Sequence, residues 1–280
     1  MRRPSELGRP FLFQTMQRRG GDITVESIAS ESAKFAAPLV LVHGLWCSAA
    51  VWRKFMGYLA HRGWTCHALN LRGHGDAGGR DQIGGVRIAD YVSDLRQIIA
   101  LCDTAPVVIG HDLGGLLALM CPAATTRAVV ALAPLVPHAI GGSVRPAVLS
   151  SWQARIAMWR GRRLPPPKGK LGAEYFATVP PGGATADSTL AARELVDDVF
   201  HLDVGDEGQT LVVAGECDRF SPPTAVERLA QHVRAQFRIA ERTGHAMPWA
   251  TGWEQQAAAT HRWIIRTLGE PLLLLRDDEE

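Results

Sequence analysis

An aspartate at the centre of a glycine-walled turn is the residue in this chain best placed to do chemistry. Asp112 lies in the run Gly-His-Asp-Leu-Gly-Gly, after the apolar stretch 106–109 and before the apolar stretch 116–120. The pattern predicts a buried strand, a sharp turn and a helix. Such a turn holds its central side chain above the end of a sheet, where small neighbours leave room for it. A carboxylate there is charged at neutral pH and can attack an electrophilic carbon without the help of a base.

A second carboxylate and a histidine follow later apolar stretches of the chain. Asp218 comes shortly after the stretch 210–214, and His245 comes shortly after the stretch 236–239. Each stands in a short motif, Gly215-Glu216-Cys217-Asp218 with two prolines just beyond it, and Thr243-Gly244-His245. The residue types then predict a nucleophile in Asp112, a base that activates water in His245, and a carboxylate that orients this base in Asp218.

Apolar stretches that predict strands alternate with helical patterns, such as 89–101, through the first half of the chain. Each apolar stretch is continuous, which is typical of parallel strands buried on both faces. An α/β protein with a mostly parallel sheet is therefore expected. Its strands are predicted at 23–25, 38–42, 64–69, 106–109, 128–132, 210–214 and 236–239.

The alternation stops after Pro134 and resumes near residue 210. The intervening chain carries helical patterns at 148–159 and 190–200, on either side of the Pro/Gly-rich stretch 164–170. Helices inserted between two strands of one sheet form a separate layer over its edge. We therefore expect an α/β core built from residues 1–137 and 205–280, with a helical cap from 138–204.

Two more motifs complete a recognisable set. The residues His43-Gly44-Leu45-Trp46 follow the strand predicted at 38–42, and Leu-Arg-Gly-His-Gly begins at Leu71 after the next one. The nucleophile, the acid and the histidine also follow one another in that order along the chain. With these motifs and this order, the chain resembles the α/β-hydrolase superfamily over nearly its whole length. The resemblance implies the α/β-hydrolase fold, a mostly parallel sheet with helices on both faces and an inserted helical cap. It also implies an oxyanion hole made by the backbone N–H groups of Leu45 and Leu113.

An aspartate in place of the usual serine resembles the branch that includes epoxide hydrolases and haloalkane dehalogenases. Asp112 would form an ester with the substrate, and water activated by His245 would then hydrolyse it. Epoxide opening is the first expectation, although it needs a proton donor for the ring oxygen, and Tyr175 is the one tyrosine in the predicted cap. Attack on the carbonyl of a lactone or ester is the first alternative. Dehalogenation is disfavoured, because Leu45 and Leu113 have no side-chain donors for a halide.

A non-hydrolytic relative, in which Asp112 acts as a base or the triad only binds a ligand, is the remaining alternative. For the substrate pocket we expect contributions from Trp46, Tyr175 and His111. A structural role is the competing interpretation of His111.

Charge and composition limit the classes of binding partner that we expect. The formal net charge is +2, which favours neither nucleic acid nor a membrane, and the five cysteines show no paired spacing. We expect a cytoplasmic enzyme for a small-molecule substrate, with no cofactor and no metal; the oligomeric state is left open. Seven basic residues precede the first acid of the cap, Glu174, and form either a solvated face or a docking surface for an anionic substrate or an acidic carrier protein. They are Arg145, Arg155, Arg160, Arg162, Arg163, Lys168 and Lys170.

Overall fold

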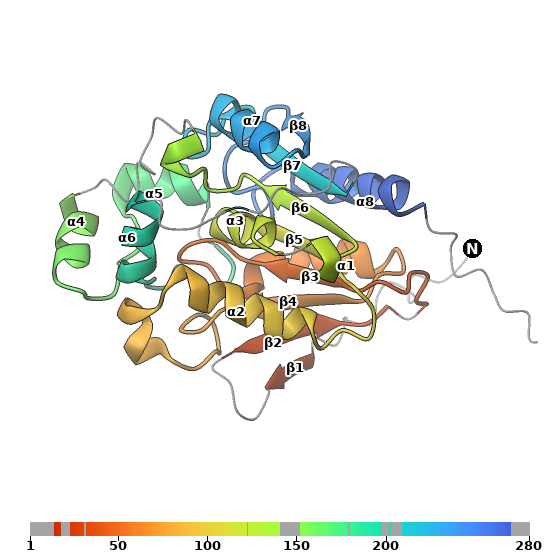
Figure 1. The fold of residues 1–280 in the computed structure, drawn as a ribbon, viewed down its shortest axis with the longest axis horizontal. Helices are drawn as coiled ribbons and strands as arrows, with labels where there is room; N and C mark the ends of the chain where they lie inside the picture. Colours follow the sequence, from red (N-terminus) through yellow and green to blue (C-terminus); the bar gives the residue numbers. More distant parts are fainter. Residues whose placement is uncertain are drawn as a thin grey trace, which may run out of the picture.

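A twisted sheet of eight strands runs through the centre of the computed structural model (Figure 1). The structure describes residues 14–17, 23–30, 32–121, 123–140, 152–178, 180–197, 202 and 209–269. The strand order is β1-β2-β4-β3-β5-β6-β7-β8. The strands are β1 (Gln14–Gln17), β2 (Thr24–Ile28), β3 (Leu39–Val42), β4 (Cys66–Asn70), β5 (Val107–His111), β6 (Ala128–Leu132), β7 (Thr210–Gly215) and β8 (Gln236–Ala240).

The strands from β4 to β8 pair in parallel, and β1 and β2 add antiparallel pairs at one edge. Every residue of β3, β5, β6 and β7 is buried, as expected for parallel strands covered on both faces. The expected strands are all present within a few residues of their predicted bounds. Strand β1 was not predicted, because its sequence Gln-Thr-Met-Gln has no apolar pattern; it pairs with β2 at the edge of the sheet.

Helices cover both faces of the sheet. Helices α1 (Arg53–Ala60) and α8 (Trp253–Leu268) contact each other behind it, and α2 (Ile88–Ile99) contacts α3 (Leu113–Leu119) in front of it (Figure 1). Helix α7 (Pro223–His232) packs on β7 and β8. The helix predicted at 89–101 is confirmed by α2. Short 3-10 turns lie at Ala49–Trp52, Arg80–Gly85, Ala123–Thr125 and His138–Ile140.

Three further helices gather at one end of the molecule, and we call them the cap helices (Figure 1). They are α4 (Trp152–Trp159), α5 (Gly169–Phe176) and α6 (Thr189–Asp197). The helices predicted at 148–159 and 190–200 correspond to α4 and α6, and the segments 148–151 and 198–200 lie outside the described residues. Helix α5 was not predicted, because two glycines and the prolines before it weaken the helical pattern. The cap boundaries at 138 and 204 stay a prediction.

A backbone bridge between Leu164 and Asp187 joins the chain on either side of α5. None of the described helices has both the length and the apolar character needed to cross a membrane.

Candidate active site

Asp112 stands in a strained turn between β5 and α3. Its φ is 53° and its ψ is −118°, a conformation that costs a non-glycine residue free energy and is found mainly at functional sites. The flanking glycines are required sterically. A Cβ on Gly110 would lie 2.0 Å from the carbonyl oxygen of Gly114, and a Cβ on Gly114 would lie 2.3 Å from that of Val42. The glycine-walled turn of the sequence therefore has a direct geometric reason.

The structure brings Asp112, Asp218 and His245 together at the carboxyl ends of β5, β7 and β8. Nδ1 of His245 lies 2.8 Å from Oδ2 of Asp218, and Nε2 lies 3.5 Å from Oδ1 of Asp112. All three side chains are buried. His245 therefore lies between two carboxylates.

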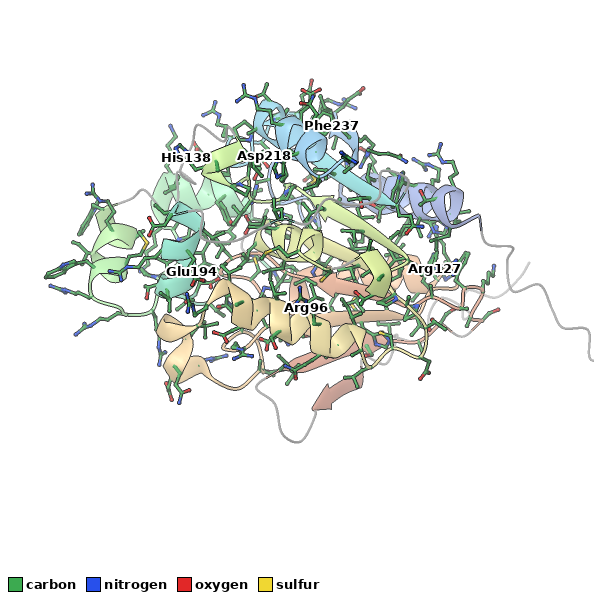
Figure 2. All side chains as sticks on the ribbon, in the orientation of Figure 1. Arg96, Arg127, His138, Glu194, Asp218 and Phe237 are labelled. Atoms are coloured by element: carbon green, nitrogen blue, oxygen red, sulfur yellow. The ribbon has the colours of Figure 1, made fainter. Side chains whose placement is uncertain are left out.

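Asp218 is fixed independently of the histidine. Its Oδ1 accepts hydrogen bonds from the backbone N–H groups of Phe220, at 2.8 Å, and Ser221, at 3.0 Å. Figure 2 labels Asp218 beside α7, in the loop that follows β7. With one oxygen held by the backbone, the other can orient the imidazole of His245.

The two oxygens of Asp112 have different surroundings. Oδ2 accepts hydrogen bonds from the N–H of Leu45, at 2.8 Å, and from the O–H of Tyr175, at 2.7 Å. Oδ1 has no hydrogen-bond partner within the described part of the chain, and the same holds for Nε2 of His245. One oxygen is thus anchored while the other keeps its lone pairs free beside the histidine.

The donors at Oδ2 differ in part from those expected. Leu45 lies where the sequence predicts it, in the loop after β3. The N–H of Leu113 makes no hydrogen bond to Asp112 among the described contacts, and Tyr175 from cap helix α5 supplies the second donor. The predicted oxyanion-hole role of Leu113 stays a prediction, and Tyr175 lies within the site, as predicted for a pocket residue.

Electrostatics inside the site favour an imidazolium between two carboxylates. Burial disfavours the charged form of His245, but the negative charges of Asp218 and Asp112 outweigh it and raise the pKa of His245 to about 10. Burial likewise opposes ionisation of Asp112, yet His245, His111 and the Tyr175 hydroxyl hold the pKa of Asp112 below its ordinary value. At neutral pH the resting site therefore holds a charged Asp112 and a charged His245.

Tyr175 closes the site from the cap side. Its ring is buried, and the ring centroids lie 4.6 Å from His245, 5.1 Å from Phe220 and 5.3 Å from Trp46. Burial and the neighbouring Asp112 charge raise the pKa of Tyr175 well above its ordinary value. The hydroxyl is therefore protonated and donates to Asp112.

The other two predicted pocket residues make contacts within the protein. The indole N–H of Trp46 donates to the carbonyl of Leu164 at 3.3 Å. Nε2 of His111 lies 2.8 Å from the backbone carbonyl of His245, and burial, with a contribution from His245, lowers the pKa of His111 to about 4. A neutral His111 with its proton on Nε2 donates to this carbonyl and so positions His245. A contact of Trp46 or His111 with substrate stays a prediction.

Asp187 is a buried carboxylate that the sequence did not point to. It lies between α5 and α6, just before α6, where Asp187-Ser188-Thr189 indicates only the start of a helix. Its contacts hold Trp46, whose φ of 59° is strained, next to the Leu45 donor. The groups around the carboxylate are Trp46 N–H at 2.9 Å, Ser188 N–H at 2.7 Å, Tyr91 O–H at 3.1 Å and His74 Nε2 at 3.2 Å.

A metal centre finds no support in the described ranges, which contain no group of three or more His, Cys, Asp or Glu side chains able to hold an ion.

Comparisons with known proteins agree with this architecture. One solved structure is a monoacylglycerol lipase from Paleococcus ferrophilus, with 19% identity over 84% of this chain and 98% of the lipase, and a TM-score of 0.63. A soluble variant of monoglyceride lipase from Saccharomyces cerevisiae, in complex with a substrate analogue, has 12% identity over 95% of this chain and 99% of that protein, with a TM-score of 0.68. Est1E from Butyrivibrio proteoclasticus, with ferulic acid bound, has 13% identity over 92% of this chain and 100% of that protein, with a TM-score of 0.63.

These identities support the fold alone. No curated protein sequence matches the chain. The model of the alpha/beta hydrolase family matches residues 39–259, which span the nucleophile turn, Asp218 and His245. Because this match covers most of the sequence, the chain belongs to the alpha/beta hydrolase family.

Proposed function

We propose that the protein hydrolyses epoxides through a covalent ester on Asp112. The observation that carries the proposal is the asymmetry of this carboxylate. Oδ2 is held by two donors, whereas Oδ1 accepts no hydrogen bond from any residue that the structure describes and lies 3.5 Å from Nε2 of His245. Attack by Oδ1 on a saturated carbon makes an ester whose carbonyl oxygen, Oδ2, already sits between hydrogen-bond donors.

Attack on the carbonyl of an ester or lactone is less well supported. That reaction places a negative charge on the substrate oxygen, which needs donors of its own. The Leu45 N–H is engaged with Oδ2 of Asp112, which leaves the Tyr175 O–H as a single donor for that charge. The lipases and the ferulate-bound protein among the solved structures resemble this chain in fold, and their low identity carries no argument on substrate.

Dehalogenation has less support still, because a departing halide needs N–H donors in the pocket. The indole N–H of Trp46 donates to the Leu164 carbonyl, and that of Trp249 donates to the Phe176 carbonyl. These two indoles are thereby committed to the protein.

Ring opening consumes one proton. Oδ1 of Asp112 forms a bond to a ring carbon, the carbon–oxygen bond of the ring breaks, and the alkoxide takes the proton of Tyr175. Ester formation removes the Asp112 charge that raises the pKa of Tyr175, so the phenol becomes a better acid as the bond forms. The tyrosinate then regains a proton from the imidazolium of His245. The ring centroids of Tyr175 and His245 lie 4.6 Å apart. His245 is left neutral.

Ester hydrolysis returns that proton. Neutral His245 accepts a proton from water at Nε2, and the hydroxide attacks the carboxyl carbon of Asp112. The negative charge forms on Oδ2, where Leu45 and Tyr175 donate. Collapse releases a diol, whose second hydroxyl takes the proton of the new carboxyl group. Asp218 stabilises the imidazolium, and the site is back in its resting charge state.

The test is turnover on a matched set of substrates. The purified protein is incubated with styrene oxide, 1,2-epoxyhexane, p-nitrophenyl butyrate and 1-bromohexane, and diol, nitrophenol and bromide are measured. Diol is expected as the main product, with a loss of about 10³-fold or more in Asp112→Ala. Asp103→Ala removes an exposed carboxylate and serves as the matched control. Release of nitrophenol or bromide with no diol from either epoxide would contradict the assignment.

A further inference from the structure

Cap helix α4 exposes an apolar face. Trp152 is 70% exposed, Ile156 is 41% exposed and Trp159 is 77% exposed. Their spacing of four and three residues places them on one side of the helix, while Ala154 and Ala157 are buried on the other side. The three apolar side chains and Arg155 line a shallow surface depression of about 370 Å³. Trp152 and Trp159 lie two helical turns apart on this face. Exposed apolar surface of this kind marks a site that binds a partner.

The chain around this face is strongly basic. Residues 152–170 contain no acidic side chain, and their six basic side chains are exposed. Two of these are paired, Arg163 with Asp81 and Lys170 with Glu174. No ion pair joins the other four to any described residue. The six are Arg155, Arg160, Arg162, Arg163, Lys168 and Lys170.

Position in the fold makes this face available to a flat surface. Helix α4 is the outermost of the cap helices and lies at the end of the molecule away from α8 (Figure 1). Nitrogen-tipped side chains project outward at this end (Figure 2). A planar surface can therefore reach α4 without meeting the sheet or the helices that cover it.

We infer that α4 binds the surface of an anionic phospholipid bilayer. The indoles of Trp152 and Trp159 enter the headgroup region, where tryptophan is favoured because its ring is apolar and its N–H can hydrogen-bond. Arg155 and Arg160 contact lipid phosphates, and the other cations add attraction at longer range. This contact is peripheral, it replaces the expectation that the protein has no membrane partner, and it does not depend on the chemistry at Asp112.

Two other occupants fit the observations less well. A second copy of the chain would bring two sets of six cations face to face, and like charges repel. An acidic protein would suit the charges, but it would need a groove for a convex helix with two protruding indoles. A bilayer surface adapts to such a shape without a preformed groove.

The test is sedimentation of the full-length protein with vesicles. We expect binding to vesicles in which one-third of the phosphatidylcholine is replaced by phosphatidylglycerol, little binding to pure phosphatidylcholine, and weaker binding as salt is added. Trp152→Ala with Trp159→Ala should lower the partition coefficient about tenfold. Arg155→Glu with Arg160→Glu should lower it roughly fivefold for each arginine.

Matched controls come from exposed positions elsewhere. Leu101→Ala with Ile239→Ala removes exposed apolar side chains away from α4, and Arg262→Glu reverses an exposed charge on α8. Both should bind as the wild type does, and circular dichroism should show all variants folded. Absence of binding at low salt, or equal binding by the α4 variants, overturns the inference. Self-association lost with the two indoles would assign the face to a second copy, and capture by polyglutamate without vesicle binding would assign it to an acidic protein.

Discussion

The hydroxyl of Tyr175 donates a hydrogen bond to Oδ2 of Asp112 over 2.7 Å. This bond joins cap helix α5 to the strained turn after β5, so the cap supplies a polar group to a site otherwise built by the sheet. The second donor to the same oxygen, Leu45 N–H, comes from the loop after β3. The other oxygen, Oδ1, has no hydrogen-bond partner among the described residues and faces His245.

Replacing Tyr175 by Phe removes this donor while keeping the ring. In single-turnover measurements with styrene oxide, we expect ester formation and ester hydrolysis both to slow, by about 10²-fold each, because the phenol serves both steps. Tyr58→Phe, which changes a partly exposed tyrosine stacked on Arg62, should leave both rates unchanged. Unaltered rates in Tyr175→Phe would remove the tyrosine from the mechanism.

Replacing Asp187 by Asn disturbs the loop that carries the Leu45 donor. An amide cannot accept all the hydrogen bonds that the carboxylate accepts from Trp46, Ser188 and Tyr91, so we expect a loss of about 1.5–3 kcal/mol in the free energy of unfolding. The kcat should fall more than KM changes, since the loop positions a donor without touching substrate. The comparison is Asp103→Asn, at an exposed carboxylate, with both kinetics and urea unfolding measured. An Asp187→Asn variant that matches this control in both assays would refute the positioning role.

The charge on His245 makes stability depend on pH. Its folded-state pKa, about 10, lies above its ordinary value of 6.5. The protonated imidazole therefore stabilises the fold fully below about pH 6.5, and this contribution is lost as the pH rises toward 10. The difference in unfolding free energy between wild type and His245→Gln should be largest near pH 6 and should shrink by pH 10. A difference that stays constant or grows over this range would show that the imidazole is neutral in the fold.

Two glycine substitutions test different effects. Gly110→Ala tests whether the turn has space for a Cβ, and Gly57→Ala tests helix propensity alone. A Cβ on Gly110 would meet the Gly114 carbonyl oxygen at 2.0 Å, whereas a Cβ on Gly57, within α1, has no atom within 4 Å. We expect Gly110→Ala to lose at least about 3 kcal/mol of stability and Gly57→Ala to gain about 0.5–1 kcal/mol. Thermal and urea unfolding measure both. Equal effects of the two substitutions would mean that the turn can accommodate a Cβ at position 110, contrary to the geometry.

The approach of Asp112, Asp218 and His245 could be predicted, because each follows an apolar stretch and parallel strands align their carboxyl ends. The donor at Leu45 was expected from the resemblance to the α/β-hydrolase superfamily. The partner of Tyr175 could not be predicted, since it depends on how α5 packs over the sheet. Asp187 could not be found either, because three of its four partners, Trp46, His74 and Tyr91, lie in distant parts of the chain and share no spacing.

Formation of an ester on Asp112 during turnover can be detected in the intact mass of the His245→Gln variant. After incubation with styrene oxide, this variant should form the ester and fail to hydrolyse it. We expect a mass gain of one epoxide per chain, carried by the peptide that contains Asp112 and absent from the double variant that also has Asp112→Ala. Wild-type diol formation, with no mass gain in His245→Gln, would contradict it.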